Sequence, residues 1–343
     1  MNRIDNCGDL VCGPDTKLID ALRLIDNASP NVFQIVASTD GRVLGTVTDG
    51  DIRRGMLRDV SMEDAVEQCM NRSPICGLTG DDVANRVLLQ RSWFLPIIDG
   101  EGRLAHILLR PKLERPLHRA LLMAGGFGRR LGDLTRETPK PLLPVGGRPI
   151  LDRLLEQIEN AGVSDVHIAV HYKASQIKDF VKARRNAADI HFIDEDEPLG
   201  TAGALSRLSS GAQEPILVVN GDVLTHVDLI AMHEFHRSHG YDGTIAVSRH
   251  EVQIPYGVIR QTPDGVFSGI DEKPRINHFV AAGIYLLSPE FVALTPQDRA
   301  VDMPELLTLG CGAGLRAGLF PVHEYWKDVG APGDLAAAQR DHV

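Results

Sequence analysis

The chain has 343 residues, of which 43% are hydrophobic and 24% charged, a composition typical of a globular protein and not of a disordered one. This length favours two domains over one. The formal net charge of -10 disfavours nucleic acid and anionic membranes as partners, so an anionic ligand needs a local basic site.

Two further readings concern the compartment. No window approaches the roughly 18 apolar residues of a membrane span. The opening segment MNRIDNCGDL lacks the apolar core of a secretory signal, so we expect a cytoplasmic protein.

The odd cysteine count and the lack of C-x-x-C spacing disfavour both a disulfide framework and a zinc site. We therefore expect buried free thiols at Cys7, Cys12, Cys69, Cys76 and Cys311.

The first third of the chain repeats one pattern. DTKLIDALRLIDN has apolar residues at helical spacing, with Asp15 as a candidate N-cap. VFQIVA then predicts a strand, and TDGRVLGTVTDGDIRRGML predicts a turn, a strand, a turn and a helix. A weaker second copy follows, with DDVANRVLLQRS as its helix and WFLPIID and GEGRLAHILL as its strands. Neither copy can bury a core alone, so we expect the two to pack together.

Residues 1–113 resemble a tandem pair of cystathionine-β-synthase-type (CBS) domains. In that family a threonine at a strand end and an aspartate three residues later hold an adenine nucleotide, and Thr48 and Asp51 match these positions. The second copy has Leu109 and Lys112 there and does not match. The alternative is that TDGD is a turn that caps a helix. We place the linker in LRPKLERPLHRA, which divides the chain into domains 1–115 and 116–343.

The central stretch MAGGFGRRLGDLTRETPKPLLPVGGRPI is long, basic and rich in glycine and proline. Stretches of this length without regular structure are usually functional or disordered. A strand at Ala120–Met123 leads into Gly125 and Gly126, where backbone N–H groups can approach a phosphate. The dinucleotide pattern G-x-G-x-x-G fails at Leu131, and no Gly-Lys-Ser/Thr follows, so this is neither a Rossmann fingerprint nor a P-loop.

AGGFGRRL followed by TPKPLLPVGGRPIL resembles the signature of sugar-1-phosphate nucleotidyltransferases. The resemblance covers residues 118–343, because LGTAGAL, VVNGD, YGVI, DEKP, AGIYLL, DMPELL and FPVHEYWKDVGAPGDL follow in the family's order. The CBS pair and the ending HEYWKDVG most resemble the CBS-containing branch, which includes guanylyltransferases that act on amino-sugar phosphates. The chemistry brings several negative charges together, so cations on a backbone that wraps phosphates suit it.

The resemblance implies a role for each matching residue. Arg130 would clamp the triphosphate, and Lys140 would neutralise charge around the α-phosphate. Asp222 and Asp328 would bind Mg²⁺; a lone aspartate at a strand end more often caps a turn, but the motif context favours metal here. Backbone contacts to the nucleotide would come from Ala124, Gly125, Gly126, Gly128, Gly200, Thr201 and Gly203, and the sugar phosphate would be held by Gly257, Glu272 and Lys273.

Two features depart from the pattern or add to it. Ala281 stands where the family often has an asparagine that lines the sugar site, which leaves the identity of the sugar open. The histidines of HEFHRSH are three residues apart and drift around a helix, so we expect a solvated helical face instead of a metal site. His323 is expected to be structural.

We therefore expect an α/β protein, with the CBS pair followed by a Rossmann-like, mostly parallel sheet covered by helices on both faces. Its predicted activity is Mg²⁺-dependent transfer from a nucleoside triphosphate to a sugar 1-phosphate, giving a nucleotide-sugar for surface polysaccharide or glycan synthesis. GTP is the first choice, and UTP, dTTP and CTP stay open. The resemblance also implies a homo-oligomer. The rival hypothesis is a non-catalytic nucleotide sensor on the same fold.

Overall fold

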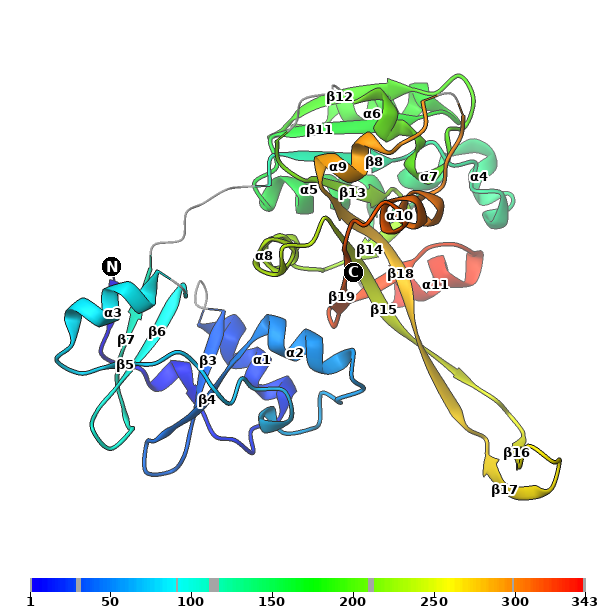
Figure 1. Ribbon diagram of the computed structural model, residues 1–343. Helices are drawn as coiled ribbons and strands as arrows, with labels where there is room; N and C mark the ends of the chain where they lie inside the picture. The colour runs from blue at the N-terminus through cyan, green and yellow to red at the C-terminus, as the bar shows by residue number, and fades with distance from the viewer. Residues whose placement is uncertain are drawn as a thin grey trace. The chain divides into compact units, whose positions relative to one another are not determined.

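The structure is a computed structural model that describes residues 2–28, 32–90, 92–110, 117–208, 213–297 and 299–341. It divides into two compact units, Met1–Arg115 and Pro116–Val343 (Figure 1). Half of the predicted linker, residues 111–116, lies outside the described residues. Across the described ranges, no helix combines the length and the apolar character that crossing a membrane requires.

The first unit repeats one order of elements. A short strand runs parallel to the first strand of an antiparallel hairpin, and a helix lies between them in sequence. The two sheets have the strand orders β2-β3-β4 and β1-β7-β6-β5. The bounds are β1 (Asn2–Ile4), β2 (Val11–Cys12), α1 (Leu18–Asn27), β3 (Phe33–Ala37), β4 (Val43–Thr48), α2 (Asp49–Met56), β5 (Gly77–Leu78), α3 (Asp82–Leu89), β6 (Phe94–Ile98) and β7 (Leu104–Leu109).

The two copies share a core, as the sequence predicted. Phe33 of the first copy stacks on Phe94 of the second, with ring centroids 4.0 Å apart, and Trp93 packs edge-on against both rings. The predicted cap of the first helix is wrong, because α1 begins at Leu18 with Lys17 at the N-cap position. The cysteine expectation holds in part. All five thiols are free, but Cys311 is exposed and only Cys12 and Cys69 are buried.

The second unit is built on a seven-stranded sheet with the order β12-β11-β8-β13-β18-β15-β19. The first four of these strands are parallel, and β18 joins antiparallel between β13 and β15. The strands are β8 (Arg119–Met123), β9 (Pro144–Val145), β10 (Arg148–Pro149), β11 (Asp165–Val170), β12 (Asp189–Asp194), β13 (Ile216–Asn220), β14 (Val223–Thr225), β15 (Gly243–Gln253), β16 (Gly257–Gln261), β17 (Phe267–Glu272), β18 (Arg275–Leu287), β19 (Ala317–Val322) and β20 (Trp326–Asp328).

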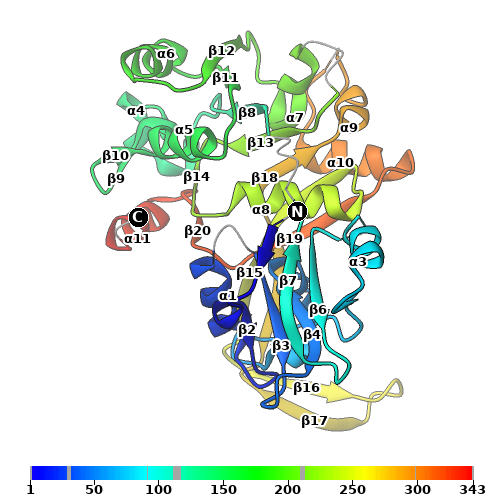
Figure 2. The ribbon, with the colours of Figure 1, turned by 90° about the vertical axis from the view of Figure 1, so that its left-hand side faces the viewer.

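Helices cover both faces of this sheet, as predicted (Figure 2). Alternate side chains of β8 enter different cores: Ala120 and Leu122 pack on one face, and Leu121 packs on the other. The helices are α4 (Leu134–Glu137), α5 (Ile150–Asn160), α6 (Ala174–Ala183), α7 (Gly200–Gly203), α8 (Leu229–His239), α9 (Pro289–Ala293), α10 (Met303–Gly312) and α11 (Pro332–Arg340). The carboxyl ends of β8, β11, β12 and β13 therefore meet at one edge, where ligands of such sheets bind.

Two histidines of α8 are buried, so the predicted solvated face is wrong for them. His233 and His236 are each 5% exposed, and they lie on the same helix face as the core residues Met232 and Phe235. The Nδ1 atom of His236 lies 2.9 Å from the hydroxyl of Thr244. Burial lowers the pKa of His236 to about 4, and the nearby His233 lowers it further while Asp242 opposes the shift.

This burial predicts a pH dependence of stability. An unfolded histidine has a pKa of about 6.5, so protons favour the unfolded chain once the pH falls below that value. His236 does not lower the free energy of unfolding above pH 6.5. As the pH falls toward 4 this free energy decreases, by about 2 kcal/mol at pH 5. We expect His236→Gln, which can still bond Thr244, to flatten the dependence of the unfolding free energy on pH between 7 and 5. Calorimetric unfolding measures it, with the exposed His250→Gln as control, and a wild-type slope in His236→Gln would contradict the prediction.

Candidate active site

The glycine-rich segment after β8 is ordered by close backbone contacts. Gly128 has φ 65°, and a Cβ there would lie 2.8 Å from the Cγ2 of Thr135, so only glycine fits. Short helical turns at Arg129–Leu131 and Lys140–Leu142 and the β9–β10 hairpin follow. The stretch that follows β8 is thus a folded loop.

Lys140 is the best-buried charged side chain of this loop, with 7% of its surface exposed. Its Nζ donates to Oδ2 of Asp222 at 2.6 Å and lies 3.7 Å from Oδ1 of Asp328. One ammonium group therefore faces two carboxylates that are 106 positions apart in the chain, from 222 to 328.

A small antiparallel sheet brings these two aspartates together. Asp222 directly precedes β14, Asp328 ends β20, and Val223 of β14 pairs with Asp328. Burial raises the pKa of Asp328, and the charge of Asp222 raises it further, while Lys140 and Arg130 oppose the shift. Within the described ranges, Oδ1 of Asp328 is buried and has no hydrogen-bond partner.

Arg130 joins the same cluster. A Cβ on Gly330 would lie 3.2 Å from Oδ2 of Asp328 and 3.3 Å from Nη1 of Arg130, so both side chains lie against this glycine. The structure thus brings together four of the predicted residues, which we call the charge cluster: Arg130, Lys140, Asp222 and Asp328. Two cations and two anions converge at the strand ends beside the glycine-rich loop.

The donor set of the charge cluster fits Mg²⁺. Its two carboxylates, of which Asp328 has one buried oxygen without a hydrogen bond, supply the hard oxygen ligands that Mg²⁺ prefers. In the part of the chain that is described, no group of three or more His, Cys, Asp or Glu side chains could enclose a metal ion. A cation held by Asp222 and Asp328 would therefore complete its shell with substrate oxygens and water.

Glu195, which the sequence reasoning missed, lies beside the glycine-rich loop. It follows β12 directly, and its Oε2 accepts a hydrogen bond from the Leu199 N–H at 3.2 Å. A Cβ on Gly125 would lie 3.4 Å from this Oε2. Burial raises the pKa of Glu195, and no hydrogen-bond partner for its buried Oε1 is found among the described residues. The rule that identified Asp222, a carboxylate at a strand end, would also have found Glu195.

The other predicted nucleotide contacts lie at α7. Gly200 has φ 80°, which favours glycine, and it packs against the backbone of Val301. The Thr201 N–H donates to Oδ1 of Asp302, and the Thr201 hydroxyl accepts from the Met303 N–H. The side chain of Thr201 therefore tethers α7 to the start of α10.

The three residues predicted to hold the sugar phosphate lie elsewhere. Gly257, Glu272 and Lys273 are on or beside the β16–β17 hairpin, which Figure 1 places at the far end of the extended β15–β18 pair. A Cβ on Gly257 would lie 2.9 Å from Oε2 of Glu272, so these two residues are neighbours. They are not part of the charge cluster within the chain.

In the first unit, Thr48 and Asp51 form a capping box at the start of α2. Oδ2 of Asp51 accepts from both the N–H and the hydroxyl of Thr48, and Arg54 donates to Oδ1. These contacts give both residues a structural role in the helix.

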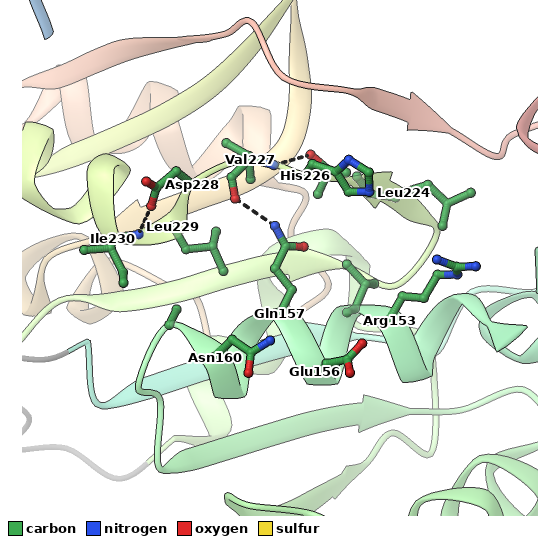
Figure 3. Close-up of a pocket in the computed structure, with 14 residues that line it drawn as sticks. Arg153, Glu156, Gln157, Asn160, Leu224, His226, Val227, Asp228, Leu229 and Ile230 are labelled. Carbon is green, nitrogen blue, oxygen red and sulfur yellow. Dashed lines mark hydrogen bonds between the residues drawn. The ribbon is translucent and has the colours of Figure 1, made fainter. Parts of the chain in front are cut away.

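A groove of about 420 Å³ lies between α5 and the segment from β14 to α8 (Figure 3). Gln157 crosses part of it and donates to the carbonyl of Val227 at 2.7 Å. Its lining contains none of the charge cluster. Because chemistry requires the convergent charges, we locate the candidate site at the charge cluster and not at this groove.

Comparisons with known proteins agree on the family. The profile of the nucleotidyl transferase family matches residues 119–343, and that of the CBS domain matches residues 8–58. The second copy of the N-terminal repeat stays a prediction as a CBS domain.

Among curated proteins, the catalytic subunit beta of mannose-1-phosphate guanylyltransferase from Drosophila pseudoobscura pseudoobscura is 34% identical over 225 residues. The match covers 63% of this chain, which spans 60% of that relative's length.

Among solved structures, HddC from Yersinia pseudotuberculosis is 27% identical with a TM-score of 0.51, and the match covers 66% of this chain and all of HddC. The same protein complexed with GMP-PN is 26% identical with a TM-score of 0.50 over the same shares. With its charge cluster in place and its last 225 residues matched as a whole, the chain belongs to the nucleotidyl transferase family.

Proposed function

We propose that the chain transfers a nucleotidyl group from a nucleoside triphosphate to a sugar 1-phosphate, with release of pyrophosphate. The observation that carries this proposal is the charge cluster, in which Lys140 bridges Asp222 and Asp328 next to Arg130 and the glycine-rich loop. Such a site can bind a phosphate chain and a divalent cation together. A non-catalytic sensor would not need all four of these charged groups, so the rival hypothesis has less support.

Each group has a role in this reaction. Bound by Asp222 and Asp328, Mg²⁺ would supply Lewis-acid polarisation of the reacting phosphate. Lys140 and Arg130 hold fixed positive charge where negative charge grows on the α-phosphate and on the leaving pyrophosphate. Because Lys140 is almost fully buried, it needs no reorganisation from bulk water when that charge develops.

Glu195 supports GTP as the donor. A carboxylate only accepts hydrogen bonds, and guanine presents two adjacent donors, N1–H and N2–H₂, on its pairing edge. Uracil and thymine present one donor between two acceptors. The unpartnered Oε1 of Glu195 and its position beside Gly125 fit guanine best, and the relatives named as guanylyltransferases agree with this choice.

The acceptor, the N-terminal unit and the location are proposals or predictions of the same kind. We propose that Glu272 and Lys273 hold the sugar and its phosphate. Mannose 1-phosphate is the first acceptor to test, because a relative is named for it. An adenine nucleotide at Thr48 and Asp51 stays a prediction, as does a cytoplasmic location.

The function is tested by pyrophosphate release from the purified chain with Mg²⁺. GTP, UTP, dTTP and CTP are each combined with mannose, glucose and amino-sugar 1-phosphates. We expect release only when both substrates are present, with the highest kcat/KM for GTP. Absence of release from every combination would refute the proposal and favour the sensor.

Asp222→Asn and Asp328→Asn should each lower Mg²⁺-dependent kcat by roughly 10²–10³-fold, because each removes a charged oxygen ligand from the charge cluster. Steady-state kinetics at saturating Mg²⁺ measure it. The exposed Asp179→Asn on α6 is the matched control and should behave as wild type. Rates near wild type in both cluster variants would show that the aspartates have only a structural role.

Glu195→Gln should narrow the preference for GTP over UTP by roughly tenfold to a hundredfold, because the amide nitrogen would face a guanine donor. The ratio of the two kcat/KM values measures it. Glu197→Gln, an exposed change in the same segment, should leave the ratio unaltered. An unchanged ratio in Glu195→Gln means that the base is recognised by other groups.

A further inference from the structure

Residues 249–279 form an extended arm. β15 pairs with β19 up to Ser248 and Val322; from Arg249 onward its strand partner in the described ranges is β18 alone. This pairing runs without interruption to Gln253 and Arg275, and the β16–β17 hairpin closes the arm (Figure 1).

The arm is too long to bring its tip to the charge cluster of the same chain. Its base is fixed beside β20, because the indole of Trp326 donates to the carbonyl of Ala282 at 2.8 Å. Lys273 is nine residues before Ala282, and at about 3.3 Å per residue this places it roughly 30 Å along the arm. While β15 and β18 stay paired in this register, Lys273 stays distant from Asp328.

The hairpin at the tip has two different faces. Ile259 and Ile270 pair across the strands and share one face with Gly257 and Glu272. Both isoleucines are more than half exposed. The opposite face carries an ion pair between Arg260 and Asp271. The first face thus combines an aliphatic wall with a carboxylate, and that combination suits the C–H groups and hydroxyls of a sugar.

The arm also exposes several large apolar side chains. A two-stranded hairpin is marginally stable in water, and contiguous exposed apolar groups mark a binding surface. Seven of its large hydrophobic side chains are 41–74% exposed: Val252, Tyr256, Ile259, Val266, Phe267, Ile270 and Ile276.

We propose that the arm of one copy docks on residues 117–341 of a second copy and brings Glu272 and Lys273 to that copy's charge cluster. This rests on the proposed function. Lys273 would add a cation for the sugar phosphate to a charge cluster whose own two cations and two anions balance. In a two-fold dimer the exchange is reciprocal, so each of two sites is built from both chains.

Subunit complementation tests the proposal. Chains carrying Lys273→Ala and chains carrying Asp222→Asn are co-expressed with different tags, and the heterodimer is purified on both tags. The first chain has an intact charge cluster and the second an intact arm. If the arm acts on the partner, one of the two sites is complete, and the heterodimer should recover about half of the wild-type kcat per dimer.

The controls separate the possible failures. A heterodimer of Asp222→Asn with Asp328→Asn should stay inactive, because both of its clusters are damaged. The proposal would be overturned if the heterodimer of Lys273→Ala with Asp222→Asn showed no activity above background. Full activity of the Lys273→Ala homodimer would also overturn it. An inactive wild-type protein would refute the proposed function instead, and the dimer measurement below then decides the arm's docking.

The second measurement needs no activity. Ile259→Ser and Arg260→Ser introduce the same residue at adjacent positions on opposite faces of the hairpin. Sedimentation of the full-length chain should show a wild-type dimer and, for Ile259→Ser, a dissociation constant raised roughly tenfold or more. Arg260→Ser should change it much less. A monomeric wild type, or equal effects of the two changes, would overturn the docking.

Discussion

The ion pair between Lys140 and Asp222 is the constraint on which the rest of the second unit depends. A buried ammonium group is tolerated only with a close partner, because an unpaired buried charge costs several kcal/mol. Asp222 supplies that partner at 2.6 Å, and Asp328 adds a second carboxylate. The loop carrying Lys140, the end of β13 and strand β20 must therefore meet at one point, where the proposed reaction needs positive charge, oxygen ligands and a phosphate cradle.

The same point explains why glycine is required around the cluster. Gly128 packs against Thr135 and Lys140, and Gly330 packs against Asp328 and Arg130. A side chain at either position would displace one of the charged groups. The backbone approach that was predicted to serve phosphates therefore also serves to bring the protein's own charges together.

Sequence reasoning predicted the α/β class, the helices on both faces of the sheet and the residues of the charge cluster. Asp222 could be predicted as a site residue because a buried strand precedes it. Asp328 needed the motif context, since its approach to Asp222 depends on the pairing of β14 with β20, which joins segments 100 residues apart. Glu195 could have been found by the strand-end rule, because it follows β12 directly.

Other features could not be predicted from local pattern. The alternation in YGVIRQ and VFSGID indicates two strands. The same alternation would occur whether the β16–β17 hairpin folded back onto the sheet or extended away from it. Only the continuous register of β15 and β18 establishes the arm. His233 and His236 were misjudged because their spacing was considered without Met232 and Phe235, whose packing places that helix face against the sheet.

The central claim is that Lys140 and a divalent cation share the carboxylates of Asp222 and Asp328. It is tested most directly by Mn²⁺ binding to the protein without nucleotide, followed by electron paramagnetic resonance. Lys140→Met keeps the apolar stem and removes the charge next to both carboxylates. The account predicts that this variant binds Mn²⁺ roughly tenfold more tightly than wild type, because a competing cation about 3–4 Å away is worth about 1–4 kcal/mol. Unchanged or weaker binding would contradict the claim that lysine and metal occupy one site.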